Sequence, residues 1–294
     1  MTSSPCLLKF KPQKLSTFSK NGSQSRKIEQ IAIKASLEYA LMILILPHDI
    51  IIFMKSVDIV VPVYNEEAEL EDSIKKLRLF LQDNLKNYNW KIVIADNASK
   101  DNTLKIAKDI SKKLTNVSFV HLDQKGRGRA IKKTWSESKA DFVSYMDVDL
   151  STDLSHFPKI IKALEVGYDI AIGSRLLPKS KVIGRLLKRE IISRCYNFLI
   201  KLAFLVKFHD AQCGFKATTK KVVNELFPYL LDNEWFLDSE LLIVGEKAGY
   251  KIYEEPVKWV DNQGSTVKVM KTARGDIDGL IRLFKTRPWR NVKK

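Results

Sequence analysis

Two aspartates, Asp147 and Asp149, directly follow an apolar run at residues 142–146 that is typical of a buried strand. Two carboxylates one residue apart, exposed where a strand ends, suit a divalent cation that holds a phosphate. Magnesium or manganese fits such oxygen ligands, and zinc does not, because no suitable set of His and Cys residues accompanies them. Since Asp-x-Asp is also common by chance, its meaning depends on the residues around it.

Polar residues follow other apolar runs of the chain in the same way. Strands are predicted at residues 57–63, 90–95 and 117–122. Because the carboxyl ends of parallel strands meet at one edge of a sheet, the loops after them are expected to converge with the aspartate pair. The residues concerned are Tyr64, Asn65 and Glu66 after the first strand, Asp96 and Asn97 after the second, and Lys125, Gly126 and Arg127 after the third.

The segments between these strands have helical spacing of their apolar residues. Helices are predicted over residues 66–85, 103–114 and 129–138, with the fourth strand at 141–146. This alternation predicts an α/β fold with a doubly wound, mainly parallel sheet.

Each loop also has a simpler interpretation. The acids after the first strand could only cap a helix, and the glycine loop at 125–130 could be a solvated turn instead of an anion site at a helix N-terminus. Asp96 could accept hydrogen bonds from a base or a ribose. Neither a Rossmann dinucleotide site nor a P-loop is predicted, because neither glycine spacing is present.

The net charge is strongly basic: 50 Lys and Arg against 34 Asp and Glu give +16. Such an excess indicates an anionic partner, which could be nucleic acid, anionic lipid or a phosphorylated substrate. Nucleic acid is disfavoured because no RNP, zinc-finger or helix-turn-helix signature is present. The cysteines, Cys6, Cys195 and Cys213, are far apart, which favours a reducing compartment over a disulfide framework.

The chain is expected to contain three parts. Residues 1–30 are polar and basic and are predicted to be disordered. Residues 31–54 are apolar but interrupted by Pro47 and Asp49, short of the ~20 apolar residues of a spanning helix. A transmembrane anchor, a membrane-surface or packing helix, and an extension without a folded role all remain open for this segment. Residues 55–294 are predicted to form the catalytic domain, and Met54 could be its functional start.

Two segments inside that domain alternate basic and apolar clusters, around residues 180–208 and 277–290. This pattern is typical of amphipathic helices that lie in an anionic membrane interface. A core helix with a solvated basic face is the alternative. The prediction is peripheral attachment to the cytoplasmic face of a membrane, or anchoring by the N-terminal segment.

The order of the motifs resembles glycosyltransferase family 2, whose members have the A-type glycosyltransferase fold. Downstream blocks resemble its polyprenyl-phosphate transferases, first the dolichyl-phosphate β-glucosyltransferases and then the dolichol-phosphate mannose synthases. The resemblance covers about residues 57–284, and the blocks at 210–216 (DAQCGFK) and 235–242 (WFLDSELL) are its most specific parts. The remaining blocks are 172–175, 189–194, 254–259 and 264–265.

The resemblance implies roles for individual residues. Asp147 and Asp149 bind Mg²⁺ or Mn²⁺, with Val148 between them at the diphosphate. Catalytic roles fall to Asp238, at the acidic position near the acceptor, and to Arg175 and Arg189, which meet phosphates of donor or acceptor. The remaining cofactor-binding positions are Pro62, Tyr64, Glu66, Ile94, Asp96 and Ser193.

The sequence departs from the family pattern at two positions. Ser151 stands where the mannose synthases carry a Gln that helps to hold the metal. Thr266 stands where a Lys usually follows Gly-Ser, although Lys268 could substitute for it. The second departure puts one phosphate contact on the acceptor side in doubt.

The function expected from this resemblance is inverting, metal-dependent transfer of a hexose from a nucleotide-diphosphate sugar, UDP-glucose, to polyprenyl (dolichyl) phosphate, a step of protein glycosylation. An ionised phosphate acceptor needs cations such as Arg175 and Arg189 more than a base, whereas a hydroxyl acceptor would need one, with Asp238 or Glu240 as candidates. The alternatives are a GDP-mannose donor, a saccharide hydroxyl acceptor, or a sugar-nucleotide binding protein without turnover.

Overall fold

The computed structural model describes residue 34, residues 54–261 and residues 269–293. The chain divides into two units, residues 1–53 and 54–294, and the second holds the fold described below. The predictions for residues 1–30 and 31–53, and those for residues 264–268, lie outside the described residues. The division of the chain into three parts therefore stays a prediction.

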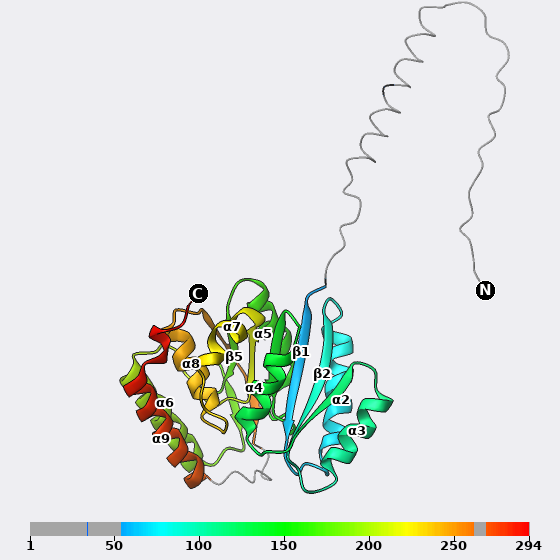
Figure 1. The fold of residues 1–294 in the computed structure, drawn as a ribbon, viewed down its shortest axis with the longest axis horizontal. Helices are drawn as coiled ribbons and strands as arrows, with labels where there is room; N and C mark the ends of the chain where they lie inside the picture. Colours follow the sequence, from blue (N-terminus) through cyan, green and yellow to red (C-terminus); the bar gives the residue numbers. More distant parts are fainter. Residues whose placement is uncertain (1–33, 35–53, 262–268, 294) are drawn as a thin grey trace, which may run out of the picture. The chain divides into compact units, whose positions relative to one another are not determined.

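A seven-stranded sheet runs through the domain in the order β3-β2-β1-β4-β7-β5-β8 (Figure 1). Neighbouring strands are parallel except around β7, which is antiparallel to both β4 and β5. The doubly wound, mainly parallel sheet predicted from the sequence is thus confirmed. The strands are β1 Ser56–Val63, β2 Asn89–Asn97, β3 Val117–Leu122, β4 Phe142–Met146, β5 Ile170–Ser174, β7 Phe215–Thr219 and β8 Ile252–Pro256.

Helices cover both faces of the sheet (Figure 1). The α-helices are α2 Leu70–Asn84, α3 Thr103–Lys113, α4 Arg127–Glu137, α5 Phe157–Glu165, α6 Leu187–Phe204, α7 Lys220–Leu226, α8 Leu237–Lys247 and α9 Val269–Thr286. Short 3₁₀ turns occur at η1 Leu154–His156, η2 Phe227–Tyr229 and η3 Pro288–Arg290.

Alternate residues of a strand point to opposite faces of the sheet, so they pack into two separate hydrophobic cores. On β1, Val60 packs into a core with α4, α6, α7 and α8, whereas Ile59 and Val61 pack into a core with α2, α3 and α5. Burial on both faces explains why the strands read as continuous apolar runs in the sequence.

Two predicted helix limits were wrong. The helix expected from residue 66 begins only at Leu70, because the backbone N–H of Glu66 donates to Thr103 Oγ1 and turns the chain toward the next loop. The segment around 180–208 begins with a strand, β6 (Lys181–Ile183), which pairs in parallel with β9 (Lys258–Val260). Its helix, α6, therefore starts at Leu187.

Candidate functional site

The loops after β1 and β2 are bound to each other at the carboxyl edge of the sheet. Asn65 has a left-handed backbone, with φ 56°, and its N–H donates to Ser99 Oγ over 3.0 Å. In return, the N–H of Lys100 donates to Asn65 Oδ1 over 2.8 Å. These reciprocal bonds bring together the first two polar loops noted in the sequence.

The aspartate pair lies directly after β4, at the same edge. Asp149 Oδ1 accepts a hydrogen bond of 3.0 Å from the backbone N–H of Ser151. Burial and the nearby Asp147 raise the pKa of Asp149. Burial, Glu69 and Asp149 together raise the pKa of Glu66 to about 7. Within the described residues, no ion pair joins Glu66 or Asp149 to a basic side chain.

These raised pKa values indicate negative charge that repels itself, which a divalent cation would relieve. Carboxylate oxygens are also the ligands that Mg²⁺ and Mn²⁺ prefer, and such sites usually rely on one or two carboxylates plus substrate phosphates and water. The described part of the chain contains no group of three or more His, Cys, Asp or Glu arranged as metal ligands. The aspartate pair thus fits a cation that is shared with a diphosphate.

Asp147 is held from two sides. Arg127 Nη2 lies 2.8 Å from its Oδ1. On the other side the backbone of Gly214 approaches so closely that a Cβ there would lie 1.8 Å from Asp147 Oδ2. Any other residue at position 214 would displace the carboxylate, which gives a physical reason for the glycine in the DAQCGFK block.

Arg127 connects Asp147 to Asp238. Its Nη1 lies 2.7 Å from Asp238 Oδ2, and its guanidinium lies over the rings of Tyr145 and Trp235, 4.8 and 4.7 Å from their centroids. Burial disfavours the charge of Arg127, but Asp147 and Asp238 outweigh it and raise its pKa further. The sequence placed Arg127 in a polar loop and assigned it no role.

Asp238 is buried at the start of α8, and among the described residues its side chain forms hydrogen bonds and ion pairs with Arg127, Tyr145 and Lys216. Tyr145 Oη donates a hydrogen bond to it, and Lys216 Nζ lies 3.1 Å from its Oδ1. Burial would raise the pKa of Asp238, but Lys216 and Arg127 lower it instead. A buried carboxylate with a lowered pKa that already accepts three hydrogen bonds is poorly suited to take a proton from a substrate.

The residues expected around the nucleotide lie along β1 and β2. Pro62 and Tyr64 are partly buried, and Lys125 Nζ lies 3.3 Å from the centroid of the Tyr64 ring. The side chains of Ile94 and Val148 are buried in the core on the α2 face, and Ile94 pairs with both β1 and β3.

Asp96 is fully buried beside a histidine that the sequence did not suggest. His121 Nδ1, on the neighbouring strand β3, lies 2.6 Å from Asp96 Oδ2. Asp96 Oδ1 has no hydrogen-bond partner among the described residues. A buried carboxylate oxygen in this state is costly, so it is a candidate acceptor for a donor group on a ligand.

The glycine loop at 125–130 packs against protein. Cβ atoms at Gly126 and Gly128 would lie 2.6 and 2.7 Å from the carbonyl oxygens of Asn233 and Glu234, and the N–H of Arg129 donates to Asn233 O over 2.9 Å. These glycines therefore allow α4 to approach the segment before α8, which brings Trp235 onto Arg127.

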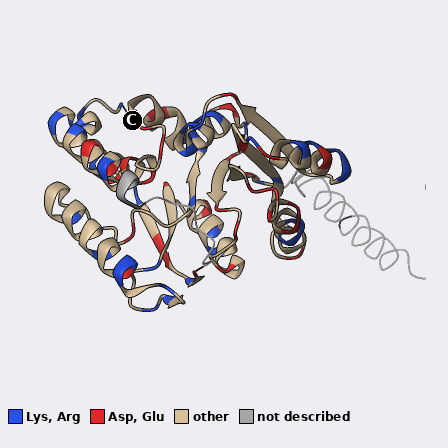
Figure 2. Ribbon diagram, turned by 90° about the horizontal axis from the view of Figure 1, so that it is seen from below, with Lys and Arg blue, Asp and Glu red and all other residues tan. Residues whose placement is uncertain are grey.

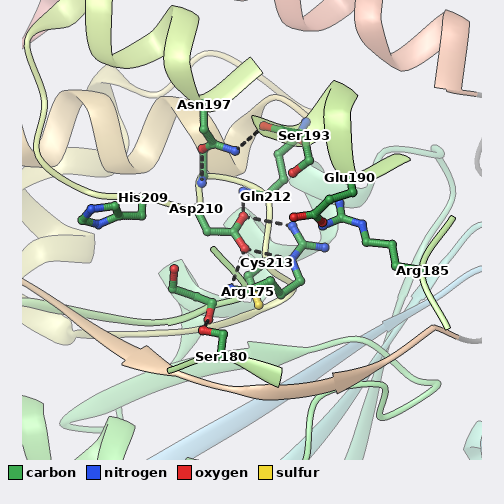
Figure 3. Close-up of polar contacts among 12 residues, drawn as sticks. Arg175, Ser180, Arg185, Glu190, Ser193, Asn197, His209, Asp210, Gln212 and Cys213 are labelled. Carbon is green, nitrogen blue, oxygen red and sulfur yellow. Dashed lines mark hydrogen bonds and ion pairs between the residues drawn. The ribbon is translucent and has the colours of Figure 1, made fainter. Parts of the chain in front are cut away.

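The arginines expected to meet phosphates are paired with aspartates, as Figure 3 shows for Arg175. Arg175 binds Asp210 in a bidentate way, with its Nε and Nη2 at 2.8 and 2.9 Å from the two carboxylate oxygens. Burial opposes ionisation of Asp210, but Arg175 lowers its pKa to about 2. Arg189, whose side chain is one-third exposed (33%), lies 3.0 Å from each carboxylate oxygen of Asp261.

Ser193 and Asn197 line the same region on α6. Asn197 Nδ2 donates to the backbone oxygen of Ser193, and Asn197 Oδ1 accepts from the N–H of Ala211, so α6 is bound to the segment that contains Asp210 (Figure 3). Ser193 Oγ is buried and has no hydrogen-bond partner among the described residues.

The structure brings the predicted site residues into two groups. Tyr64, Glu66, Asp96 and the aspartate pair lie at the carboxyl ends of β1, β2 and β4, whereas Arg175, Arg189 and Ser193 lie with the 210–216 block and α6. Asp238 contacts the first group through Arg127.

A cavity of about 590 Å³ lies beside Asp149, and the sequence gave no indication of it. Lys76 and Phe80 of α2 line one side. The remainder is lined by Leu150, Ser151, residues 153–155, Lys258, Val260 and Asp261, so Asp261, the partner of Arg189, borders the same space. The cavity therefore extends from the aspartate pair toward Arg189.

Residues 58–227 match the family model described as "Glycosyl transferase family 2". The chain belongs to this family. It is a glycosyltransferase, and the resemblance noted in the sequence is confirmed.

The relatives of this glycosyltransferase include enzymes that are named after a lipid phosphate, dolichyl phosphate. Glycosyltransferase AglD of Haloferax volcanii is 31% identical over 78% of this chain, which spans only 37% of AglD. Dolichyl-phosphate beta-glucosyltransferase ALG5D of Trichomonas vaginalis is 28% identical over 77% of this chain and 72% of the relative. The human dolichyl-phosphate beta-glucosyltransferase is 28% identical over 72% of this chain and 69% of the relative.

Solved structures share the fold. Glucosyl-3-phosphoglycerate synthase from Mycobacterium tuberculosis, in complex with UDP, has a TM-score of 0.60 and 18% identity, covering 79% of this chain and 80% of that one. The same enzyme in complex with Mn²⁺, UDP-glucose and phosphoglyceric acid also has a TM-score of 0.60, at 15% identity over the same shares. The A-type glycosyltransferase fold predicted for the chain is confirmed by this similarity.

Two helices of the glycosyltransferase expose large apolar side chains. On α6, Leu187, Phe198 and Leu202 are 74%, 65% and 65% exposed and lie on one face; on α9, Ile277 and Phe284 are 56% and 54% exposed. The two helices lie side by side (Figure 1). Lys and Arg are spread over several helices and do not gather into one patch among the described residues (Figure 2). No helix in the described ranges is both long and apolar enough to span a bilayer.

Proposed function

We propose that this glycosyltransferase transfers glucose from UDP-glucose to a polyprenyl phosphate such as dolichyl phosphate, with inversion at the anomeric carbon and with Mg²⁺ or Mn²⁺. The observation that carries the proposal is the group of three acids at the strand ends, Asp147, Asp149 and Glu66, in which burial and then neighbouring carboxylates raise the pKa of Glu66 and of Asp149. Relatives named dolichyl-phosphate beta-glucosyltransferase support the choice of sugar and acceptor.

Asp147 and Asp149 would hold the metal ion, which supplies positive charge to the diphosphate as it leaves. Gly214 and Arg127 fix the orientation of Asp147 for this task. The unpartnered Asp96 Oδ1 would accept a hydrogen bond from the nucleotide.

A polyprenyl phosphate is already largely ionised near neutral pH, so the acceptor needs no strong base. This requirement agrees with the lowered pKa of Asp238 and assigns it to positioning Arg127 and Lys216. Arg189 is the better candidate for a contact with the acceptor phosphate, because it is more exposed than Arg175 and Asp261 is its sole ion-pair partner among the described residues.

A donor and acceptor panel tests this proposal directly. The purified protein is given UDP-glucose or GDP-mannose, each with a polyprenyl phosphate or the corresponding polyprenol, in the presence of Mn²⁺. Sugar transfer from UDP-glucose to the phosphate, with EDTA abolishing it, is the expected result. Transfer from GDP-mannose alone would exclude the proposed donor, and transfer to the polyprenol would exclude the proposed acceptor. Donor binding without consumption in any combination would indicate a binding protein.

The same proposal places the enzyme on the cytoplasmic surface of a membrane, through the apolar face of α6 and α9. Apolar side chains at Leu187, Ile191, Phe198 and Leu202 recur on one face of α6, and an aqueous surface gives them no partner to bury against. A lipid acceptor requires the enzyme to meet a bilayer, which makes lipid the occupant that fits this face.

Vesicle flotation tests the membrane surface. The wild-type protein should float with vesicles containing anionic lipid, and the double variant Leu187→Ser/Phe198→Ser should stay largely in the soluble fraction. Leu79→Ser is the matched control, because Leu79 is 60% exposed on α2, away from this face. Equal flotation of all three proteins would show that the α6 face does not bind lipid.

A further inference from the structure

Arg127 is a buried cation shared by two carboxylates that come from distant parts of the chain. It is the first residue of α4, its side chain is 9% exposed, and it bridges Asp147 and Asp238 at 2.8 and 2.7 Å. The aromatic rings of Tyr145 and Trp235 flank the guanidinium. These four contacts together hold the guanidinium in one position.

Asp238 does not need Arg127 to balance its charge. Lys216, which is itself buried, lies 3.1 Å from Asp238 Oδ1, and Tyr145 donates a further hydrogen bond. The charge of Arg127 is thus available to the other carboxylate, Asp147, which is 45% exposed in its side chain and is a proposed metal ligand.

A divalent cation that binds Asp147 would enter next to this fixed positive charge. Two like charges at such short range repel strongly where water is partly excluded. Arg127 cannot move away easily, because its ion pair with Asp238 and the rings of Tyr145 and Trp235 hold its guanidinium in place. A diphosphate that arrives with the metal brings the negative charge that offsets the repulsion.

We propose that Arg127 makes metal binding conditional on the nucleotide diphosphate: the chain alone binds the divalent cation weakly, and the cation binds tightly only together with the diphosphate. The inference rests on the proposed metal role of Asp147 and Asp149. Arg127 is a positioning residue that acts through Asp147. In this role, Arg127 prevents the metal ion from occupying the site when the nucleotide-sugar donor is absent.

The test measures Mn²⁺ binding to the full-length protein by the loss of the free-ion EPR signal, with and without UDP. Mixtures of UDP and Mn²⁺ without protein correct for their own association. The wild-type protein should bind Mn²⁺ about 10-fold or more tightly in the presence of UDP than in its absence. Arg127→Gln should tighten Mn²⁺ binding in the absence of UDP by about 10-fold and reduce the effect of UDP.

Two variants separate charge from shape. Arg127→Lys keeps the positive charge without the bidentate bridge, and it should leave Mn²⁺ binding without UDP as weak as in the wild type. Arg129→Gln is the matched control, two positions further along α4. In the described structure, the Arg129 side chain donates hydrogen bonds only to the backbone oxygens of residues 124 and 125. It should change nothing.

Arg127→Gln leaves two carboxylates near one another, so its fold is checked by circular dichroism. If it is unfolded, Arg127→Gln/Asp238→Asn removes one charge of each sign and should show the same tightening. A merely structural Arg127 would weaken Mn²⁺ binding or leave it unchanged in both variants, and that result would overturn the inference. Tight Mn²⁺ binding by the wild type without UDP would also overturn it and leave the metal role intact. Failure to bind Mn²⁺ even with UDP would remove the metal role as well.

Discussion

The proposed donor side and the proposed acceptor side of this glycosyltransferase use charge in opposite ways. At the ends of β1 and β4, acids lie together, and the pKa values of Glu66 and Asp149 are raised. Beside α6, Arg175 is matched to Asp210, whose pKa falls to about 2. The acids at the ends of β1 and β4 lack a cationic partner for part of their charge, whereas Arg175 and Asp210 neutralise each other.

This contrast distinguishes binding residues from supporting residues. An acid with a raised pKa is less stable in its charged form, and a ligand of opposite charge would stabilise that form. Such a group therefore indicates a binding site. A buried ion pair whose charges satisfy each other mainly fixes the chain, and removal of one partner leaves an isolated buried charge. On this basis, Asp149 should act chiefly on catalysis and Arg175 chiefly on stability.

The largest effect is expected for Asp149→Asn. Loss of one proposed metal ligand should lower the rate of sugar transfer by roughly 10³-fold, as for removal of a main electrostatic stabiliser of a leaving group. The thermal midpoint should not fall, because the change relieves repulsion with Asp147. Transfer assays and thermal unfolding check both, and Asp123→Asn, at a fully exposed side chain, is the control. A normal rate would place the metal elsewhere.

The Arg175–Asp210 pair should show the reverse pattern. Arg175→Met alone should cost about 3–5 kcal/mol in the free energy of unfolding, because Asp210 is left charged and buried. Arg175→Met/Asp210→Leu should recover a large part of that loss. Urea unfolding of the single and double variants measures the coupling. A stable Arg175→Met protein with defective transfer would instead assign Arg175 to substrate, and the contrast between the two sides would fail.

Gly214→Ala tests the donor side without removing a charge. The added Cβ would lie 1.8 Å from Asp147 Oδ2, so the carboxylate must shift, and transfer should fall by about 100-fold through misplacement alone. Gly275→Ala is the matched control on α9, where a Cβ meets no atom within 4 Å. Comparable transfer rates in the two variants would show that the position of Asp147 is not critical.

The sequence predicted the sheet and its polar edge because both depend on local periodicity. Asp147 and Asp149 were identified because they follow an apolar strand directly. Arg127 was expected at this edge, but its pairing with Asp238 was missed, because the two residues are 111 positions apart and no local pattern reports such a pair. The phosphate roles of Arg175 and Arg189 came from the resemblance, and the sequence alone did not show the aspartates that pair with them.

Ile94 illustrates a second limit of sequence reasoning. The resemblance implied a place for Ile94 in the nucleotide pocket, but its side chain is buried in the core on the α2 face. His121 was missed for a related reason, since its contact with Asp96 crosses from β3 to β2. Register between strands, which fixes both facts, is a tertiary property.

The smallest effect is expected at Asp276, an acid on the acceptor side that resembles the donor-side group. Burial, with Asp232 and Asp238 nearby, raises its pKa to about 7, although Gln212 Nε2 donates to its Oδ2 over 2.9 Å. The folded protein therefore holds this proton more tightly than the unfolded chain does. Its contribution to stability is fully present below the unfolded pKa and is lost as the pH rises through 7.

Asp276→Asn keeps an acceptor for Gln212 and removes the titration. It should be more stable than the wild type at pH 8 by on the order of 2 kcal/mol, and the difference should shrink toward pH 4. Thermal unfolding across this range measures it, with Asp278→Asn, an exposed acid on the same helix, as the control. A difference that does not depend on pH would show that Asp276 is ionised throughout. The acceptor side would then contain only satisfied charges, and the contrast with the donor side would become sharper.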